Sequence, residues 1–284
     1  MKKKKMMKKI IDLLRAKYEV HSIYLLGSRK EKVSQNLYLK PVVSSSKSYY
    51  TFLLFIIFRD NEKLNDKKVQ KFVAKNSQTE YRIYPIVYTL SEFLQEIDSG
   101  STFLCHIQAN FTSLYKKDRY ITDLKFEPSY YLIFWKKKKS IWQTRSKRAC
   151  FLLLKLEEYD DCDIDSVAKL SMIYNCLQQL CLGLLVVCWN FKPKSLNLKY
   201  LLYLCSYYIT LLKEPENSRL TLNAYHLILD AHQIMQQDTE IQVREEESEK
   251  AAALCGNFFR EAHEIAEKEL NHYQQKCLNY EKSR

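Results

Sequence analysis

The strongest constraint on the fold is the run SYYTFLLFIIF at residues 48–58, which consists almost entirely of aromatic, leucine and β-branched residues. A strand that is apolar on both faces must be covered on both faces, so this run predicts a central strand of a sheet. Flanking strands are predicted by SIYLLGS at 22–28 and EYRIYPIVYT at 80–89. Apolar residues at helical spacing predict helices over 8–18, 65–76 and 90–100, the last with Ser91 as N-cap.

Strand patterns disappear from about residue 141 onward. Five segments with helical periodicity follow, at 146–161, 165–190, 197–212, 220–237 and 244–277. Their lengths and short connections favour an antiparallel helical bundle. The predicted fold class is therefore α+β, with a small mixed-sheet domain over 1–122, a linker over 123–140 that contains four consecutive lysines, and an all-α bundle over 141–284.

Composition restricts the partners and the compartment. The formal net charge of +12 favours polyanions, but much of the excess sits in MKKKKMMKK at the start and KKKK at 136–139, which is typical of solvated lysines. Nine cysteines without a C-x-x-C pair predict buried thiols rather than a zinc site. Charges interrupt the segment after the basic start, and the apolar stretch at 180–189 is too short to span a bilayer. We therefore expect a cytoplasmic protein that does not engage a membrane.

The order of these elements carries a family resemblance. A strand ending in LLGSR at 25–29, the strand YYTFLLFII at 49–57 and the segment 81–117 together resemble the minimal nucleotidyltransferase domain of the DNA polymerase beta superfamily. The segment 168–205 is similar to a HEPN domain, a helical bundle often found beside such nucleotidyltransferases. Over nearly its whole length the chain resembles the two-domain nucleotidyltransferase-like/HEPN proteins of the Bacteroidetes. The positions that match these families are Phe93, Gly100, Ser101, Phe103, Leu114 and Tyr115 in the first half, and Asn190, Phe191, Asn197 and Leu198 in the second.

The first resemblance implies a Gly-Ser turn that holds a triphosphate and an Asp-x-Asp pair that places Mg²⁺ on the next strand. The place of that pair is taken here by the residues 48–51, and no Asp or Glu occurs between Lys32 and Arg59. Asp60 and Glu62, beyond the strand, are interpreted as solvated charges. The active site is therefore expected to be degenerate, with no catalytic residue and no metal. Phosphate or nucleotide binding without turnover is predicted at Gly27, Ser28, Arg29 and Lys30, although a purely structural glycine turn explains the same residues.

The second resemblance implies a ribonuclease motif in which Arg precedes His by a few residues. Gln236 stands where the family has its Arg, and Leu196 replaces a family His, so this site is also predicted to be degenerate. Arg219 and His226 satisfy the spacing only formally, because they are about two helical turns apart. The acidic run DDCDID at 160–165 is interpreted as a solvated cluster at a helix start rather than a metal loop.

The leading hypothesis is a non-catalytic module that binds a nucleotide, RNA or another protein and needs no cofactor. The resemblance to HEPN bundles implies a homodimer formed through the helical domain. The alternative is an active nucleotidyltransferase, with Mg-nucleotide as its ligand, or a HEPN-type ribonuclease of a toxin-antitoxin-like system. We expect the protein not to be an enzyme, and the sequence leaves that question open.

Overall fold

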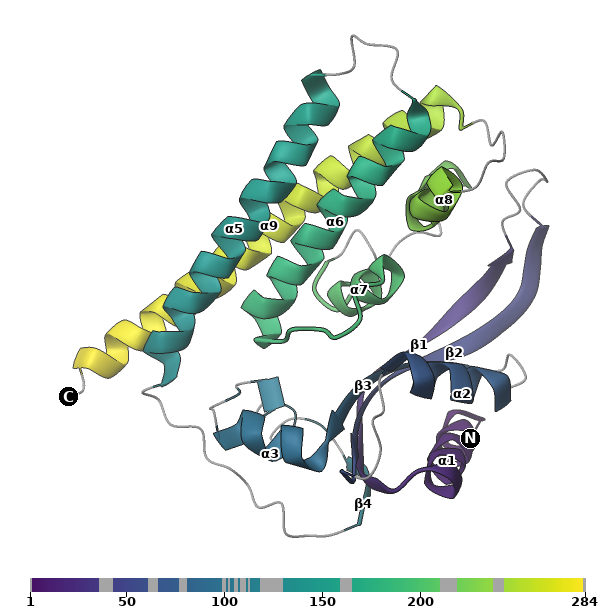
Figure 1. The fold of residues 1–284 in the computed structure, drawn as a ribbon, viewed down its shortest axis with the longest axis vertical. Coiled ribbons are helices and arrows are strands. Elements are labelled where there is room, and N and C mark those ends of the chain that lie inside the picture. Colours follow the sequence, from purple (N-terminus) through teal and green to yellow (C-terminus); the bar gives the residue numbers. More distant parts are fainter. Residues whose placement is uncertain are drawn as a thin grey trace. The chain divides into compact units, whose positions relative to one another are not determined.

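The computed structural model describes residues 2–35, 43–60, 66–76, 81–98, 101, 103–104, 107, 111, 113–117, 130–158, 165–209, 219–236 and 243–282. Side chains are described for this set without residues 2, 31–35, 43–48, 130–134, 219–223 and 280–281. The chain divides into two compact units, Met1–Glu127 and Pro128–Arg284 (Figure 1). The first unit is a mixed α+β structure and the second is mostly helical, as the sequence predicts.

The first unit is built on a four-stranded mixed sheet with the order β3-β2-β1-β4. Its strands are β1 (Val20–Gln35), β2 (Val43–Phe58), β3 (Tyr81–Thr89) and β4 (Ser113–Lys116). β1 pairs antiparallel with both β2 and β4, whereas β2 pairs in parallel with β3. Three helices whose bounds are described accompany the sheet, α1 (Lys2–Lys17), α2 (Asp66–Asn76) and α3 (Leu90–Asp98).

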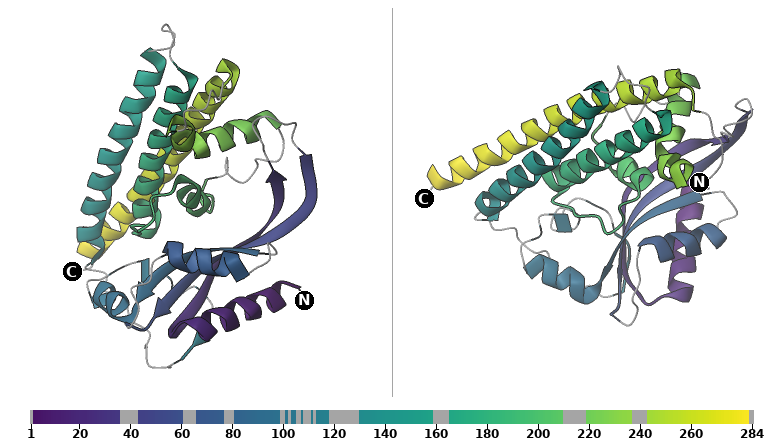
Figure 2. Two further views of the ribbon diagram at one scale, coloured as in Figure 1. Left: turned by 45° about the vertical axis from the view of Figure 1, so that its right-hand side comes forward. Right: turned by 45° about the horizontal axis from the view of Figure 1, so that its top comes forward.

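Strand β2 is covered on both faces, which confirms the prediction for its apolar run. On one face Phe52, Leu54, Ile56 and Phe58 belong to a core with residues of α1 and α2 such as Ile10 and Val69. On the opposite face the ring of Phe55 contacts the rings of Phe93 in α3, Phe103, Tyr24 and Tyr88. Figure 2 shows α1 and α2 on one side of the sheet and α3 on the other.

A capping box fixes the start of α3. Thr89 Oγ1 accepts a hydrogen bond from the backbone N–H of Glu92 at 3.2 Å, and Glu92 Oε2 accepts from the N–H of Thr89 at 3.0 Å. The predicted N-cap, Ser91, is therefore wrong, because Thr89 already fills that role. Ser91 instead donates from its backbone N–H and its hydroxyl to Asp60 Oδ1, and these bonds lower the pKa of the Asp60 carboxyl. Glu62 lies outside the described residues.

Strand β3 forms one edge of the sheet, and its outer side is protected. The backbone N–H of Val87 donates to Oδ1 of the buried Asp66 at 3.0 Å, where α2 begins. The backbone nitrogen of Pro85 is on the same outer side, because it precedes Val87 by two residues, and it carries no hydrogen to donate. Asp66 therefore satisfies a main-chain donor that the sheet itself leaves without a strand partner.

The second unit is a bundle of five long or medium helices in the described part of the chain. They are α5 (Tyr130–Glu158), α6 (Ser166–Trp189), α7 (Leu198–Cys205), α8 (Arg219–Gln236) and α9 (Glu245–Lys282). Helix α6 contacts the other four, and α5, α6 and α9 run side by side (Figure 1). α6 is long and apolar enough to cross a membrane by length and composition, but 67% of that window is buried inside the unit. Its apolarity is therefore accounted for by its central place in the bundle.

The structure changes the prediction of where the first helix of this unit begins. α5 starts at Tyr130, so residues 130–140, which the sequence suggests are linker, form its first turns. α6 agrees with the predicted helix over 165–190: it ends at Trp189, and its C-cap, Asn190, adopts the left-handed conformation with φ 53°. At the start of α6, Asp165 Oδ1 accepts from the N–H of Val167 at 3.0 Å, so this acid is an N-cap. The other residues of the acidic run lie outside the described residues.

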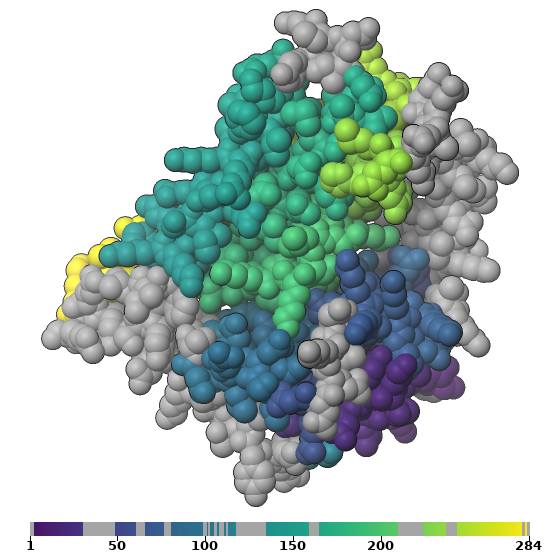
Figure 3. Space-filling model, viewed as in Figure 1, coloured from purple at the N-terminus to yellow at the C-terminus, as the bar shows by residue number. Residues whose placement is uncertain are grey.

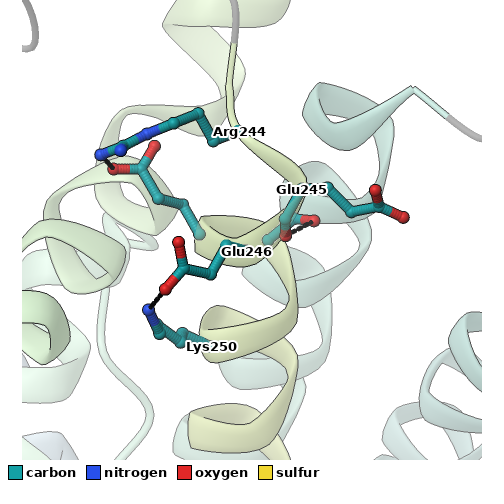
Figure 4. A network of polar contacts seen from close by, with 6 residues as sticks. Arg244, Glu245, Glu246 and Lys250 are labelled. Atoms are coloured by element: carbon teal, nitrogen blue, oxygen red, sulfur yellow. Dashed lines mark hydrogen bonds and ion pairs between the residues drawn. The ribbon is translucent and has the colours of Figure 1, made fainter.

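Charges at the start of α9 complement the helix dipole. Its first turn holds Glu245, Glu246 and Glu247. Arg244 bonds to Glu247 at 3.1 Å, and Glu246 is paired with Lys250 (Figure 4). Acidic side chains at a helix start are stabilised by the partial positive charge of its free N–H groups. All five of these residues are charged and near the surface, so this network defines the helix start without forming a ligand cluster.

Helices α5 and α6 approach closely at Gly183. A Cβ atom at this position would lie 2.9 Å from Trp142 Cε3 and 3.2 Å from Arg145 Cβ. Trp142 is itself almost completely buried. The absence of a side chain at Gly183 therefore allows the indole ring to lie against the backbone of α6. By contrast, a Cβ atom on Gly256 in α9 would meet nothing within 4 Å.

Candidate phosphate-binding face of the sheet

Gly27 and Ser28 lie within strand β1 and not in a turn. β1 continues to Gln35, and its backbone pairs Gly27 with Leu53 and Ser28 with Phe52. The register shifts between Leu25 and Gly27, which marks a β-bulge. The predicted Gly-Ser turn is therefore wrong, because the glycine occurs at a bulge inside a long strand, another position where glycine is favoured.

The alternation of side chains along β1 divides the four predicted phosphate-binding residues between two faces. Residues directly opposite each other in an antiparallel pair share a face. Ser28 and Lys30, opposite Phe52 and Tyr50, are on the face covered by α1 and α2. Gly27 and Arg29, opposite Leu53 and Thr51, are on the other face. A single site formed by all four residues is therefore inconsistent with the strand geometry.

Arg29 instead belongs to a row of residues that crosses three strands. Arg29 in β1 is the backbone partner of Thr51 in β2, and Thr51 is the partner of Arg82 in β3. Since neighbouring strands are about 4.8 Å apart, the two arginines start about 10 Å from each other on either side of the threonine. We refer to Arg29, Thr51 and Arg82 as the arginine–threonine row.

The central member of the row carries an unused polar atom. Thr51 is completely buried, and its Oγ1 has no hydrogen-bond partner within the described part of the chain. A buried hydroxyl without a partner costs roughly 1–3 kcal/mol. Sequence reasoning noticed Thr51 only as a replacement for a carboxylate and missed its position between two arginines, which depends on the register of both neighbouring strands.

Tyr49 extends the row on the same face, two residues from Thr51. The guanidinium of Arg82 lies 4.4 Å from the centre of the Tyr49 ring, and its Nη1 donates to Tyr49 Oη at 3.2 Å. This stacked arrangement holds the Arg82 side chain in one orientation. Arg82 is exposed and Arg29 is partly exposed, so solvent reaches both cations.

A further cation and a further hydroxyl lie along the same face. Lys116 in β4 is paired with Ser22, and its Nζ lies 5.6 Å from the centre of the Tyr24 ring. The Tyr24 hydroxyl is buried and has no partner among the described residues, and burial raises its pKa. This face of the sheet thus combines three cationic side chains with aromatic rings.

The described charged side chains of this face are cationic, whereas a catalytic metal ion is held by negatively charged carboxylates. Tyr49 and Thr51 occupy the place where the resemblance implies the Asp pair, and they share one face, as that pair would. Between Arg29 and Arg82, a divalent cation would be repelled. Glu31 is opposite Tyr49 in the backbone register, and its side chain lies outside the described set. The positive charge of the two arginines is complementary to an anion rather than to a metal cation.

The helical unit does not assemble the implied ribonuclease residues in its described part. Gln236 is the last residue of α8 and is exposed. His226 is partly buried, which lowers its pKa, with Lys199 acting in the same direction and Asp230 opposing. The ring of His232 packs edge-on against Tyr174, with 4.2 Å between the ring centres. Arg219 is the first residue of α8, but its side chain is outside the described set.

The structure also buries a lysine that the sequence suggests is solvated. Lys138 is 1% exposed; its Nζ donates to the backbone carbonyl of Val187 at 2.9 Å and lies 3.8 Å from the centre of the Tyr273 ring. Burial lowers its pKa to about 8, while Cys188 and Glu269 oppose that shift. Lys138 therefore joins α5 to the carbonyl end of α6 and to α9, a structural role.

Comparisons with known proteins give this chain no family. The sequence matches no model of a known protein family, and no curated protein is significantly similar to it. Within the residues that the structure describes, no group of three or more His, Cys, Asp or Glu side chains could hold a metal ion. The function must therefore be inferred from the arginine–threonine row and from the chemistry of its neighbours.

Proposed function

We propose that the first unit binds a nucleotide through its phosphates at the arginine–threonine row, without a catalytic metal and without turnover. In this proposal it is a degenerate nucleotidyltransferase-like domain, and the helical unit is HEPN-like. The observation that supports it is the row itself, in which Arg29 and Arg82 flank the unpartnered hydroxyl of Thr51 at the place of the carboxylates.

The donor set suits a phosphate group. Each guanidinium offers five N–H donors in a planar arrangement that matches two phosphate oxygens at once. The Thr51 hydroxyl lies between them and is buried in the ligand-free protein, so an anion that accepts its hydrogen bond must displace the atoms that cover it. Mg²⁺ normally neutralises part of the charge of a triphosphate, and two arginines can supply the same neutralisation directly.

Chemistry at the phosphate requires more than binding. Nucleotidyl transfer needs metal-bound oxygens to activate the attacking hydroxyl and to stabilise the leaving pyrophosphate. The side chains of the row and of Tyr49 provide hydroxyl, phenol and guanidinium groups only. These groups can hold a phosphate but none is a general base at neutral pH, so the proposal is a ligand sensor or scaffold rather than a transferase.

The test is calorimetric titration of the full chain with ATP, CTP, GTP and UTP, each with excess Mg²⁺ and with EDTA. We expect at least one nucleotide to bind as tightly in EDTA as with Mg²⁺. Arg82→Ala should weaken this binding at least tenfold, whereas Lys30→Ala, on the same strand pair but the opposite face, should leave it unchanged. Binding that requires Mg²⁺ would favour an active nucleotidyltransferase and contradict the proposal, as would the absence of binding by all four nucleotides.

Thr51→Val separates a ligand role from a structural role. The substitution replaces the buried, unpartnered hydroxyl by a methyl group, so we expect the ligand-free protein to become more stable by about 1–3 kcal/mol. The same change removes a phosphate donor, so nucleotide affinity should fall roughly tenfold. If stability and affinity change in the same direction, Thr51 is not a ligand contact.

Self-association is a second part of the proposal. The resemblance to HEPN bundles implies a homodimer, formed by the helical unit. Sedimentation velocity of the full chain between about 1 and 50 µM would reveal it as a concentration-dependent increase in the sedimentation coefficient. A single monomeric species over this range would rule it out.

A further inference from the structure

The outward side of α5 carries a high density of positive charge. From Lys136 to Leu156 the helix contains eight basic residues and no acidic one. Lys138 is buried and Arg145 is half-buried, where its Nη1 donates to Gln179 Oε1 at 2.6 Å. Five of the others, Lys136, Lys137, Lys139, Lys147 and Arg148, are exposed.

Four of these exposed cations lie along one side of the helix. Lys136 and Lys147 are eleven residues apart, as are Lys137 and Arg148, and eleven residues correspond to about three helical turns. Each pair therefore lies on one side of the helix, and the two pairs are adjacent, about 16 Å from end to end. We refer to Lys136, Lys137, Lys147 and Arg148 as the basic stripe. Part of the surface of α5 is visible in Figure 3.

The protein does not neutralise this stripe internally. No ion pair joins any of its four residues to a carboxylate in the part of the chain that the structure describes. Burial lowers the pKa of the neighbouring Arg145, and the positive charge of Arg148 acts in the same direction. A row of cations held on a rigid helix with no acidic partner is complementary to a regularly charged polyanion.

The side chains between the cations favour nucleic acid over a lipid surface. Ser140, Gln143 and Thr144 are exposed and polar, and only at the end of the helix do Phe151 and Leu154 become exposed apolar residues. A helix that lies in a membrane interface needs a broad apolar face, and α5 already uses its apolar side against α6 and α9. Polar and cationic side chains with a terminal aromatic ring are instead typical of contacts to a phosphate backbone and a stacked base.

We propose that the basic stripe of α5 binds the phosphate backbone of single-stranded nucleic acid, without reading its sequence. The site lies in the helical unit and does not depend on the arginine–threonine row of the first unit. Lysine and arginine side chains neutralise successive phosphates and release bound counterions, so affinity falls steeply with salt. Phe151, next to the stripe, is exposed and can stack on a base.

The test measures fluorescence anisotropy of a labelled 20-nucleotide oligouridine with the full chain, from 50 to 300 mM KCl. The stripe variant combines Lys136→Gln, Lys147→Gln and Arg148→Gln, all exposed and all replaced by a good helix former. We expect it to bind at least tenfold more weakly at 100 mM KCl. The slope of log affinity against log salt should become shallower by about 2, since single strands contribute about 0.7 per lost phosphate contact.

A matched control variant has the same net charge as the stripe variant. Lys67, Lys71 and Lys75 are exposed and share one side of α2, so their triple replacement by Gln removes three charges elsewhere. Equal losses in both variants would mean that binding follows net charge alone, and would overturn the proposal. No binding by the wild type would overturn it too, as would stripe-dependent binding to phosphatidylserine vesicles without binding to RNA. The stripe variant should still bind mononucleotides as the wild type does, which separates this result from a failure of the proposed function.

Discussion

The close approach of α5 and α6 at Gly183 gives a quantitative prediction with an internal control. Replacing a helical glycine by alanine stabilises an exposed helix position by about 1 kcal/mol, through propensity and the entropy of the unfolded chain. Gly256 in α9 has open space around its Cα, so Gly256→Ala should realise this gain. Gly183→Ala should not, because its methyl group would lie 2.9 Å from Trp142 Cε3.

The atoms around Gly183 have little freedom to move away. The Trp142 ring is buried against the bundle, and Arg145 Cβ, at 3.2 Å, is attached directly to the backbone of α5. Relief therefore requires the two helices to separate, and overpacking of this kind costs about 1–3 kcal/mol. After subtraction of the propensity gain, Gly183→Ala should destabilise by about 0–2 kcal/mol, and the two variants should differ by about 1–3 kcal/mol.

Urea unfolding followed by far-ultraviolet circular dichroism measures both variants, with thermal melts as a second readout. A difference of 1 kcal/mol corresponds to about 2–4 °C in Tm for a unit of this size. The double variant Gly183→Ala/Trp142→Leu should lose the overpacking cost, which appears as a favourable coupling between the two positions. Equal stabilisation by Gly183→Ala and Gly256→Ala would refute the close approach of the two helices.

Two further predictions concern buried charges. Lys138 has a pKa of about 8 in the folded protein and 10.5 in the unfolded chain, so the unfolded chain binds more protons between these two pH values. The stability of the wild type relative to Lys138→Met should therefore rise with pH in this range, by up to about 1.4 kcal/mol per pH unit. Urea unfolding of both proteins at each pH measures this difference in stability. Burial raises the pKa of Cys188, which has the opposite effect on stability, but Cys188 is present in both proteins and its contribution cancels in the difference. A difference that does not change with pH would contradict the prediction. Asp66→Ala should cost about 1–3 kcal/mol because the amide of Val87 loses its acceptor, and Asp66→Asn, which keeps an acceptor oxygen, should cost less in the same assay.

The sequence predicts three of the four strands of the first unit and its three described helices, because their patterns are local, whereas the four-residue strand β4 is not predicted. The run 48–58 predicts a covered strand, and β2 is that strand, buried on both faces. The Gly27-Ser28 prediction failed because glycine is favoured both in turns and at bulges, and only the pairing partner on β2 distinguishes them. The arginine–threonine row could not be found from one sequence, since it requires the registers of three strands that are far apart along the chain.

The lysine run at 136–139 shows the same limit in the helical unit. The periodicity that places Lys138 on the same side as Trp142 and Ala149 is visible in the sequence, and it would have indicated an inward-facing residue. The composition favoured a solvated linker instead. The sequence does not show that the carbonyl of Val187 and the ring of Tyr273 lie beside the Lys138 ammonium group, where they make its burial tolerable.

The protected edge of strand β3 also bears on how the protein behaves in crowded solution. Exposed strand edges recruit strands from other molecules and lead to aggregation. Here Pro85 and the Asp66–Val87 bond remove donors from one edge, and the other edge strand, β4, is only four residues long. Both features oppose the growth of the sheet by intermolecular strand addition, so the unit can hold a very apolar central strand such as β2 and still resist polymerisation.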